Sequence, residues 1–397
     1  MSDPDRFHPA DVLGLGRLAL EATSGIIGVA EEMHRVIASN ILPGTPTAAL
    51  VAGTTAAIYE AVRAVTGLAG SSVDAMLSQV HPLAGEEPST PERDAFLAAL
   101  NGIVGDHLVA TQNPLAIAMR FRRDGQPLAL DKERLAAAIP QPCGKLLVLV
   151  HGLCMSDLQW TRQEHNHGKA LAAELGWTPV YLQYNSGLHV SINGRGLAAF
   201  LEALATQWPS PVSELAIIGH SYGGLVARSA EHYGTEAGYG WPKYLRRLVF
   251  LGTPHQGSLL ERSGNLLDAL LGVTPYSAPL TRLTTVRSAG ITDLRYGNVL
   301  DEDWQGIDRF HDAGDHRHPF PLPTRVRCLA IAGRKEKTGR HFGDGLVSVD
   351  SALGLQAGPA HVPLFPNCGQ WVGEDLNHWD LLSDPTVYRR IRDEFES

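Results

Sequence analysis

Apolar residues recur every three or four positions over the first 112 residues of this 397-residue chain, a spacing that predicts amphipathic helices. Two such stretches cover 15–36 and 51–68. A third begins at Thr90-Pro91, where threonine is a favourable helix cap and proline fits the first helical position. We therefore predict an N-terminal helical region over 1–112. We interpret it as a cap packed on the main domain, with an amphipathic element on a membrane surface as the alternative.

The pattern changes after residue 112. Residues 113–142 are predicted to form a hairpin and a connector, because apolar and polar residues alternate around Asp124-Gly125, a favoured hairpin turn. Over 143–397, apolar runs alternate with helical stretches. The apolar runs are 146–150, 180–184, 215–219, 248–252, 326–333 and 361–365. The helical stretches are 159–175, 194–207 and the residues from 223 onward. Unbroken apolar strands separated by helices predict an α/β fold, a mostly parallel sheet with helices on both faces.

Composition limits the classes of binding partner and the cellular locations that we expect for the protein. The formal net charge of −9 argues against nucleic acid, since phosphate binding requires an excess of Lys and Arg. No apolar stretch reaches the roughly 18 residues that span a membrane, and the first residues lack the basic start and apolar block of a signal peptide. We expect a soluble cytoplasmic protein without a cofactor. Its cysteines are expected to be free thiols, with two disulfides as the alternative; they are Cys143, Cys154, Cys328 and Cys368.

The segment IIGHSYGGLV (217–226) places Ser221 between an apolar strand run and a helical run. A sharp strand–turn–helix bend strains the backbone of its central residue. It also brings together the positions two before and two after, so both favour glycine. Gly219 and Gly223 occupy these positions. The bend would raise the Ser221 hydroxyl above the sheet at the start of a helix, which makes Ser221 the candidate nucleophile.

A serine nucleophile needs a base within hydrogen-bonding distance and a third group that orients the base. In this architecture the chain order is serine, acid, histidine. His378 follows the last strand candidate and precedes a C-terminal helix, so it is the predicted base. Asp344, in a Gly-Asp-Gly loop after the 326–333 strand, is the predicted acid and is preferred to Asp350. His220 is next to the serine, but its side chain is expected to point away and to pack.

Acyl transfer also needs two backbone donors for the negative oxygen that develops in the transition state. The amide of Tyr222 is one candidate, because it follows the nucleophile directly. The amide of Leu153 is the other, because the sequence VLVHGLCMSD (148–157) places a His-Gly turn after the first core strand. His151 is expected to hold this loop by a side-chain hydrogen bond.

These segments together resemble the α/β-hydrolase superfamily and, within it, bacterial lipases and carboxylesterases. The resemblance spans about 144–395 and rests on VHGL (150–153), GHSYGG (219–224), LGTPHQGS (251–258), GDGLVSVDSA (343–352) and NHWDLLSDPTVY (377–388). The Thr-Pro-His-x-Gly-Ser segment is common in lipase-like members, including those similar to the inositol deacylases of lipid anchors. The resemblance implies a Ser221–His378–Asp344 triad and an acyl-enzyme intermediate.

An insertion over about 256–325 precedes the 326–333 strand and is predicted to form a lid or cap. Its leucines are the expected substrate-binding residues: Leu259, Leu260, Leu266 and Leu267. The histidine-rich segments 164–167 and 311–319 lack the spacing of zinc ligands, so no metal is predicted. Asp380 matches a position that helps to bind calcium in some related lipases, which leaves calcium as the alternative.

We therefore expect a serine esterase or lipase that hydrolyses moderately apolar acyl esters. Acyl transfer to an alcohol, by the same residues, is one alternative, and a non-catalytic scaffold that binds a lipid is the other. The expected partner is an ester substrate, with peripheral contact to a membrane as an alternative, and the sequence leaves the oligomeric state open.

Overall fold

The computed structural model describes residues 91–258, 287–309, 314–318, 321–335, 343–355, 364–365 and 367–397. The helices predicted over 15–36 and 51–68 lie outside the described residues. So does the predicted lid segment 259–286, which includes the four lid leucines.

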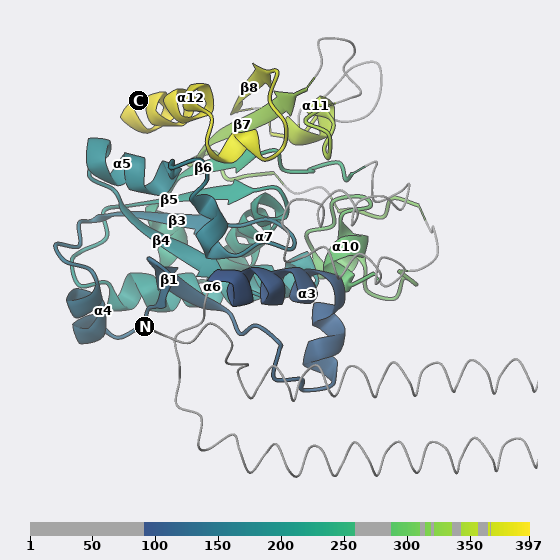
Figure 1. Ribbon diagram of the computed structural model, residues 1–397, viewed down its shortest axis with the longest axis horizontal. Helices are drawn as coiled ribbons and strands as arrows, with labels where there is room; N and C mark the ends of the chain where they lie inside the picture. Colours follow the sequence, from purple (N-terminus) through teal and green to yellow (C-terminus); the bar gives the residue numbers. More distant parts are fainter. Residues whose placement is uncertain are drawn as a thin grey trace, which may run out of the picture. The chain divides into compact units, whose positions relative to one another are not determined.

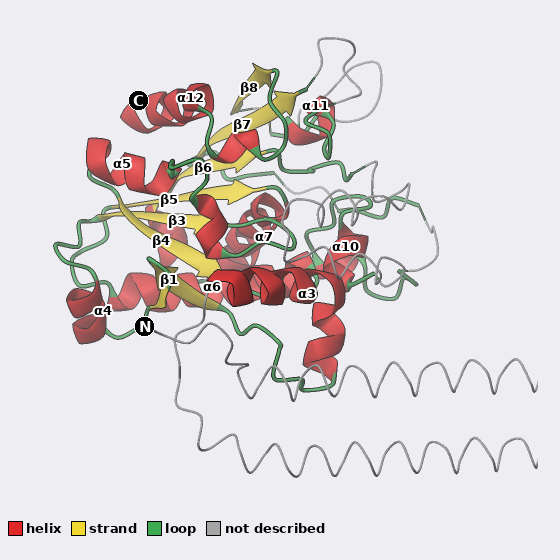
Figure 2. Ribbon diagram, viewed as in Figure 1, coloured by secondary structure: helices red, strands yellow, loops and turns green. Residues whose placement is uncertain are grey.

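An eight-stranded sheet in the order β2-β1-β4-β3-β5-β6-β7-β8 forms the centre of the fold (Figure 2). The strands are β1 (Arg120–Arg123), β2 (Gln126–Pro127), β3 (Lys145–Val150), β4 (Thr178–Gln183), β5 (Glu214–His220), β6 (Leu245–Leu251), β7 (Arg327–Arg334) and β8 (Cys368–Glu374). Strands β3 to β8 are paired in parallel, whereas β1 and β2 form an antiparallel hairpin on the β4 edge. The mostly parallel sheet and the hairpin at Asp124-Gly125 are confirmed.

Helices cover both faces of this sheet (Figure 1). The described helices are α3 (Pro91–Ala110), α4 (Lys132–Ala138), α5 (His167–Leu175), α6 (Val190–Gln207), α7 (Tyr222–Glu236), α10 (Ala289–Asp293), α11 (Val349–Ala352) and α12 (Pro385–Glu396), with short 3₁₀ turns η2 (Asp157–Trp160), η3 (Trp241–Tyr244), η5 (Asp301–Asp303) and η6 (Asp380–Leu382). Figure 1 shows α5 and α12 on one side of the strands and α6 on the other. None of the described helices combines the length and apolar character needed to cross a membrane.

The two faces of the sheet carry alternate residues of the same strands. In β3, Leu147 and Leu149 belong to one buried cluster with Val387, Ile391 and Phe395 of α12. These α12 residues are spaced four apart and so share one helix face. Side chains of neighbouring strand positions point to opposite faces, and β3 is buried on both. The sheet is therefore held from both sides, which fixes the positions of the loops at its carboxyl edge.

Two predicted elements are wrong in part. The stretch 159–175 is not one helix: η2 ends at Trp160 and α5 begins at His167, because Asn166 caps α5 and a two-residue turn joins Arg162 to His165. The last strand is β8, Cys368–Glu374, whereas Leu364 and Phe365 lie in a bend. Strand β8 has no apolar run, so its extended form depends on pairing with β7.

Cys328 of β7 and Cys368 of β8 form a disulfide. The two residues are directly paired in the parallel ladder, which brings their Cα atoms to 4.4 Å. The expectation of four free thiols is therefore wrong for this pair. A spacing of 40 residues could not identify the partners, because only the sheet register brings them together. Cys143 and Cys154 are free.

Helix α3 begins at Pro91, as predicted, and its residues 91–107 form one compact unit with 117–397. Its Asp94 forms an ion pair with Arg122 of β1, which also pairs with Asp157 of η2, each at 2.8 Å. The three side chains are almost completely buried. A buried arginine shared by two carboxylates ties the helix to the edge of the sheet, because loss of Arg122 would leave two buried carboxylates without a counter-ion. The predicted division at residue 112 stays a prediction.

Candidate active site

Ser221 occupies the bend between β5 and α7. Strand β5 ends at His220 and helix α7 begins at Tyr222, and between them Ser221 has a φ of 52° and a ψ of −126°. Residues other than glycine rarely adopt positive φ, because the Cβ crowds the backbone, so this residue is strained. Its amide donates a hydrogen bond to the Leu251 carbonyl at 2.8 Å, which fixes the bend to β6.

Glycines on both sides make the bend sterically feasible. A Cβ added to Gly219 would lie 2.5 Å from the Cα of Gly224, and one added to Gly223 would lie 2.2 Å from the carbonyl oxygen of Val150. Both atoms belong to the backbone and cannot move aside easily. Gly219 is therefore required by the backbone of Gly223 and Gly224, in line with the predicted crowding, whereas Gly223 is required by the end of β3.

Asp344 and His378 meet at the ends of two neighbouring strands, β7 and β8. The Nδ1 of His378 lies 2.7 Å from Oδ2 of Asp344. The other carboxylate oxygen, Oδ1, accepts hydrogen bonds from the amides of Leu346 and Val347 at 2.9 and 2.8 Å. Because an ionised carboxylate only accepts hydrogen bonds, this contact keeps a proton on Nδ1 of the imidazole. Asp350, the alternative acid, lies on α11.

The Nε2 of His378 is the nitrogen left to take up a proton. This atom is buried and has no hydrogen-bond partner among the described residues, so no hydrogen bond joins it to Ser221 there. Gly252, after β6, leaves room for the pair: a Cβ there would lie 3.0 Å from Asp344 Oδ2 and 3.0 Å from His378 Cε1. Catalytic hydrogen bonds are often incomplete without substrate, so this geometry is compatible with a base.

His220 packs against the predicted base. Its ring centroid lies 4.7 Å from that of His378, and its Nε2 lies 3.1 Å from the His378 carbonyl oxygen. Because a carbonyl only accepts, Nε2 carries the proton. Burial, and then the charge of His378, lower the pKa of His220 well below its ordinary value. A neutral His220 thus holds the His378 backbone, a contact that the sequence did not indicate.

The loop after β3 lies directly against the nucleophile. A Cβ added to Gly152 would lie 3.1 Å from the Cβ of Ser221. His151 holds the loop as expected, since its Nδ1 lies 2.9 Å from the Gly152 carbonyl oxygen. Burial lowers the pKa of His151 to about 4, so its ring is neutral. In the described part of the chain, no backbone carbonyl engages the amide of Leu153 or that of Tyr222, the first residue of α7.

Helix α3 supports this loop, a role that the sequence analysis missed. A Cβ added to Gly102 would lie 2.3 Å from Sγ of Cys154, so helix and loop are in close contact. Cys154 has a φ of 60° and donates its amide to Ser186 Oγ at 3.1 Å. Burial raises the pKa of Cys154 to about 12, which makes it a packing residue and not a reactive thiolate. Glycine inside a predicted helix was the available signal, because it costs stability unless packing requires it.

Three residues considered for metals have structural partners, which are His165, His167 and Asp380, whereas the segment 311–319 lies partly outside the described residues. The Nε2 of His165 lies 2.8 Å from Nδ1 of His167, whose Nε2 meets the Leu381 carbonyl at 3.0 Å. The Asp380 carboxylate accepts the amide of Asn377 at 2.9 Å and so shapes the turn that carries the predicted base. Within the described ranges, no three His, Cys, Asp or Glu side chains gather as a metal site. Calcium at Asp380 stays a prediction.

The strand order, the strained serine after β5, and the acid and histidine after β7 and β8 define an α/β-hydrolase fold. A family model described as the PGAP1-like alpha/beta domain matches residues 181–320. No curated protein matches the chain.

Solved structures similar to this chain include three bacterial enzymes. The mature lipase BlEst2 of Bacillus licheniformis is 19% identical, with 64% of this chain and 94% of that chain covered and a TM-score of 0.41. The carboxylesterase CesB (YbfK) of Bacillus subtilis is 13% identical, with 64% and 84% covered and a TM-score of 0.38. The esterase RhEst1 of Rhodococcus sp. ECU1013 is 19% identical, with 64% and 92% covered and a TM-score of 0.36.

Proposed function

We propose that this protein is a serine carboxylic-ester hydrolase. The observation that carries the proposal is the buried hydrogen bond between Asp344 and His378, formed at the carboxyl edge of the sheet that also presents Ser221 on a strained bend. A buried carboxylate that holds one imidazole nitrogen, and leaves the other bare, supports a general base. An ester is the substrate because a serine nucleophile, a base and two backbone donors are the groups that acyl transfer requires.

In the proposed mechanism, Nε2 of His378 takes the Ser221 proton as Oγ attacks the ester carbonyl carbon. The carbonyl oxygen becomes negative and accepts hydrogen bonds from the amides of Leu153 and Tyr222. The imidazolium is stabilised by Asp344, and it donates its proton to the departing alcohol, so the C–O bond breaks and an acyl-enzyme remains. Water then gives a proton to His378 and attacks the acyl-enzyme. Collapse of the second intermediate returns that proton to Ser221 and releases the acid.

The acyl part of the substrate is proposed to be moderately apolar. The leucines of the predicted lid, Leu259, Leu260, Leu266 and Leu267, are the basis, and they lie outside the described residues. We expect medium acyl chains to be turned over faster than very short ones. Contact with a membrane surface and a cytoplasmic location stay predictions.

The test is hydrolysis of p-nitrophenyl esters of increasing chain length by the full chain. We expect turnover that Ser221→Ala reduces by about 10³-fold or more, together with labelling of the wild type, but not of the variant, by a fluorophosphonate. Ser229→Ala is a matched control, since Ser229 is a second buried serine on the same chain segment, hydrogen bonded to the Val299 carbonyl.

Two outcomes would redirect the proposal. No turnover at any chain length, with no fluorophosphonate labelling, would favour a binding scaffold. Formation of a new ester when an alcohol such as glycerol is added, in place of free acid, would favour acyl transfer by the same residues.

A further inference from the structure

Tyr184 lies against the loop that carries Leu153, one of the two predicted backbone donors. Tyr184 follows β4 directly, as His151 follows β3. These two strands are paired in parallel, with Val150 opposite Leu182, so their ends are neighbours at the carboxyl edge of the sheet. Tyr184 is 1% exposed, and a buried hydroxyl needs a hydrogen-bond partner inside the protein.

Two contacts join Tyr184 to His151. The Tyr184 hydroxyl donates a hydrogen bond to the His151 carbonyl at 2.6 Å. The two rings are also stacked, with centroids 4.3 Å apart and planes 23° apart. Burial raises the pKa of Tyr184 well above its ordinary value, so the hydroxyl keeps its proton and remains a donor. Tyr184 therefore holds both the main chain and the imidazole of His151.

The direction of the Leu153 amide depends on the His151 imidazole. Its Nδ1 lies 2.9 Å from the Gly152 carbonyl oxygen, and because a carbonyl only accepts, Nδ1 carries the proton. The Gly152 carbonyl and the Leu153 N–H belong to one planar trans peptide, in which the two groups point in opposite directions. An imidazole that fixes this carbonyl therefore also fixes the direction of the Leu153 N–H.

The His151 carbonyl also lies against the helix that follows the nucleophile. A Cβ added to Gly223 of α7 would lie 2.5 Å from the His151 carbonyl oxygen. The ring of Tyr184 stacks on that of Tyr222, with centroids 6.4 Å apart. The Tyr222 hydroxyl donates to the Leu188 carbonyl at 2.6 Å. Tyr184 thus contacts both segments that carry the predicted backbone donors.

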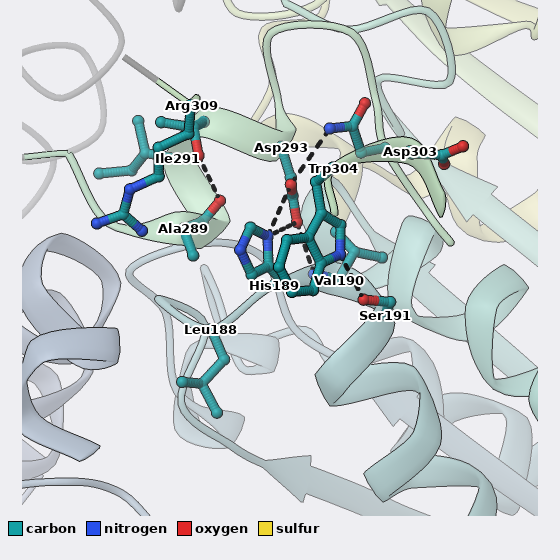
Figure 3. A network of polar contacts seen from close by, with 12 residues as sticks. Leu188, His189, Val190, Ser191, Ala289, Ile291, Asp293, Asp303, Trp304 and Arg309 are labelled. Carbon is teal, nitrogen blue, oxygen red and sulfur yellow. Dashed lines mark hydrogen bonds and ion pairs between the residues drawn. The ribbon is translucent and has the colours of Figure 1, made fainter. Parts of the chain in front are cut away.

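The chain around Tyr184 is anchored before and after this residue. Strand β4 precedes it, and the connection to α6 ends at His189, whose Nδ1 lies 3.0 Å from Oδ1 of Asp293 (Figure 3). Within this connection, the side chain of Asn185 donates to the Gly105 carbonyl of α3 at 2.9 Å. A side chain on a segment fixed in this way can hold its neighbours within the tolerance that catalysis requires.

We infer that Tyr184 is a positioning residue for the proposed reaction, acting through His151 on the amide of Leu153. The inference rests on the proposed ester hydrolysis, because the negative oxygen of its transition state is what requires an aligned amide. A misaligned donor weakens the transition state more than the bound ester. Loss of the Tyr184 hydroxyl should therefore lower kcat and leave KM nearly unchanged.

The experiment compares the wild type, Tyr184→Phe and Tyr181→Phe as full chains with a p-nitrophenyl ester. Tyr181 of β4 is the matched control, because it is also buried and its hydroxyl donates to Oδ1 of Asn166 at 2.7 Å. Each variant loses one short buried hydrogen bond, so thermal unfolding should show similar losses of stability. We expect kcat to fall about 10- to 100-fold in Tyr184→Phe, with KM changed less than about twofold. Tyr181→Phe should keep most of the wild-type kcat.

Inhibition by a trifluoromethyl ketone gives a second measurement. Oγ of Ser221 adds to the ketone carbon and passes its proton to His378, and the carbonyl oxygen becomes the negative oxygen of a tetrahedral adduct. The affinity of this inhibitor should fall in Tyr184→Phe by about the same factor as kcat/KM. His151→Ala removes the imidazole from the Gly152 carbonyl and should give the same pattern, a lower kcat with little change in KM.

Three results would overturn the inference. They are a folded Tyr184→Phe with wild-type kcat and inhibitor affinity, an equal loss of kcat in Tyr181→Phe, and a change confined to KM. A wild type that neither hydrolyses the ester nor reacts with a fluorophosphonate would refute the proposed function and this inference together. An active wild type with an unaffected Tyr184→Phe would refute the inference alone.

Discussion

In the described part of the chain, three buried aspartates contact Nδ1 of a histidine, and two of these pairs, Asp344–His378 and Asp293–His189, have different surroundings. In Asp344–His378 the histidine is 1% exposed, and its Nε2 is buried without a hydrogen-bond partner among the described residues. In Asp293–His189 the histidine is 12% exposed, stacks on Trp304 and lines a pocket between loops. The same two side chains thus leave one imidazole nitrogen buried without a partner in one place, and hold a ring stacked on an indole in the other. The pair alone does not define a catalytic site, because its neighbours decide which protonation state is useful.

The supporting structure differs as well. The first pair extends from paired strands of a sheet buried on both faces, whereas the second joins the start of α6 to the five-residue helix α10. Sheet edges hold groups at fixed separations, which acyl transfer requires. The following predictions test this contrast, from the largest expected effect to the smallest.

The largest effect is expected from His378→Ala. Loss of the proposed base should lower kcat for a p-nitrophenyl ester by about 10⁴-fold, because Ser221 then has no proton acceptor. His189→Ala, measured in parallel, should keep most of the wild-type kcat. A comparable loss of kcat in the two variants would mean that the two pairs act as one site.

Gly223→Ala should destabilise the fold by more than about 4 kcal/mol, because its Cβ would meet the backbone of β3. Chemical denaturation would measure the change. Gly240→Ala is the matched control, since the nearest atom to its Cβ would be a side-chain oxygen of Glu202, 3.3 Å away. Similar stability of the two variants would show that the bend at Ser221 is not sterically tight.

Acid should destabilise the sheet region through its buried neutral histidines. Burial lowers the pKa of His151 and of His167 to about 4. The unfolded chain binds protons near pH 6.5, so the stabilising contribution is complete above that pH and is lost as the pH falls toward 4. The free energy of unfolding should fall by about 3 kcal/mol for each histidine. Denaturation midpoints from pH 7 to pH 4 would measure it, and His167→Gln should show a shallower fall.

The disulfide between Cys328 and Cys368 joins the two strands that carry the acid and the base. Its removal in Cys328→Ser should lower the free energy of unfolding by about 2–4 kcal/mol. Thiol titration of the unfolded wild type without reductant should detect two free thiols, and four after reduction. Four thiols before reduction would show that the bond does not form in the cell. Because disulfides persist mainly in oxidising compartments, two thiols would weigh against the expected cytoplasmic location.

The smallest effect is expected at His220. His220→Leu removes the hydrogen bond to the His378 carbonyl, so kcat should fall about 10- to 100-fold with KM little changed. His220→Gln can still donate from its side-chain nitrogen and should recover part of the activity. Equal losses in both variants, or a change confined to KM, would contradict a positioning role.

Much of the candidate site was predictable because its signals are local. The bend at Ser221 is encoded by an apolar strand, two glycines and a helical run within ten residues, and the order of serine, acid and histidine follows from the chain itself. Strands with unbroken apolar runs, such as 146–150 and 215–219, were predicted for the same reason. A strand buried on both faces needs that composition, whatever its neighbours are.

The tertiary structure decided which residues distant in the sequence come into contact. Strand β8 has no apolar run and is extended because β7 pairs with it, and that register also joins Cys328 to Cys368. The contact of His220 with the His378 carbonyl spans 158 positions, and that of His189 with Asp293 spans 104. Periodicity and turn chemistry act over a few residues, so they determine elements. The packing of the whole sheet and its helices determines which elements come into contact. A local sequence pattern does not contain this information.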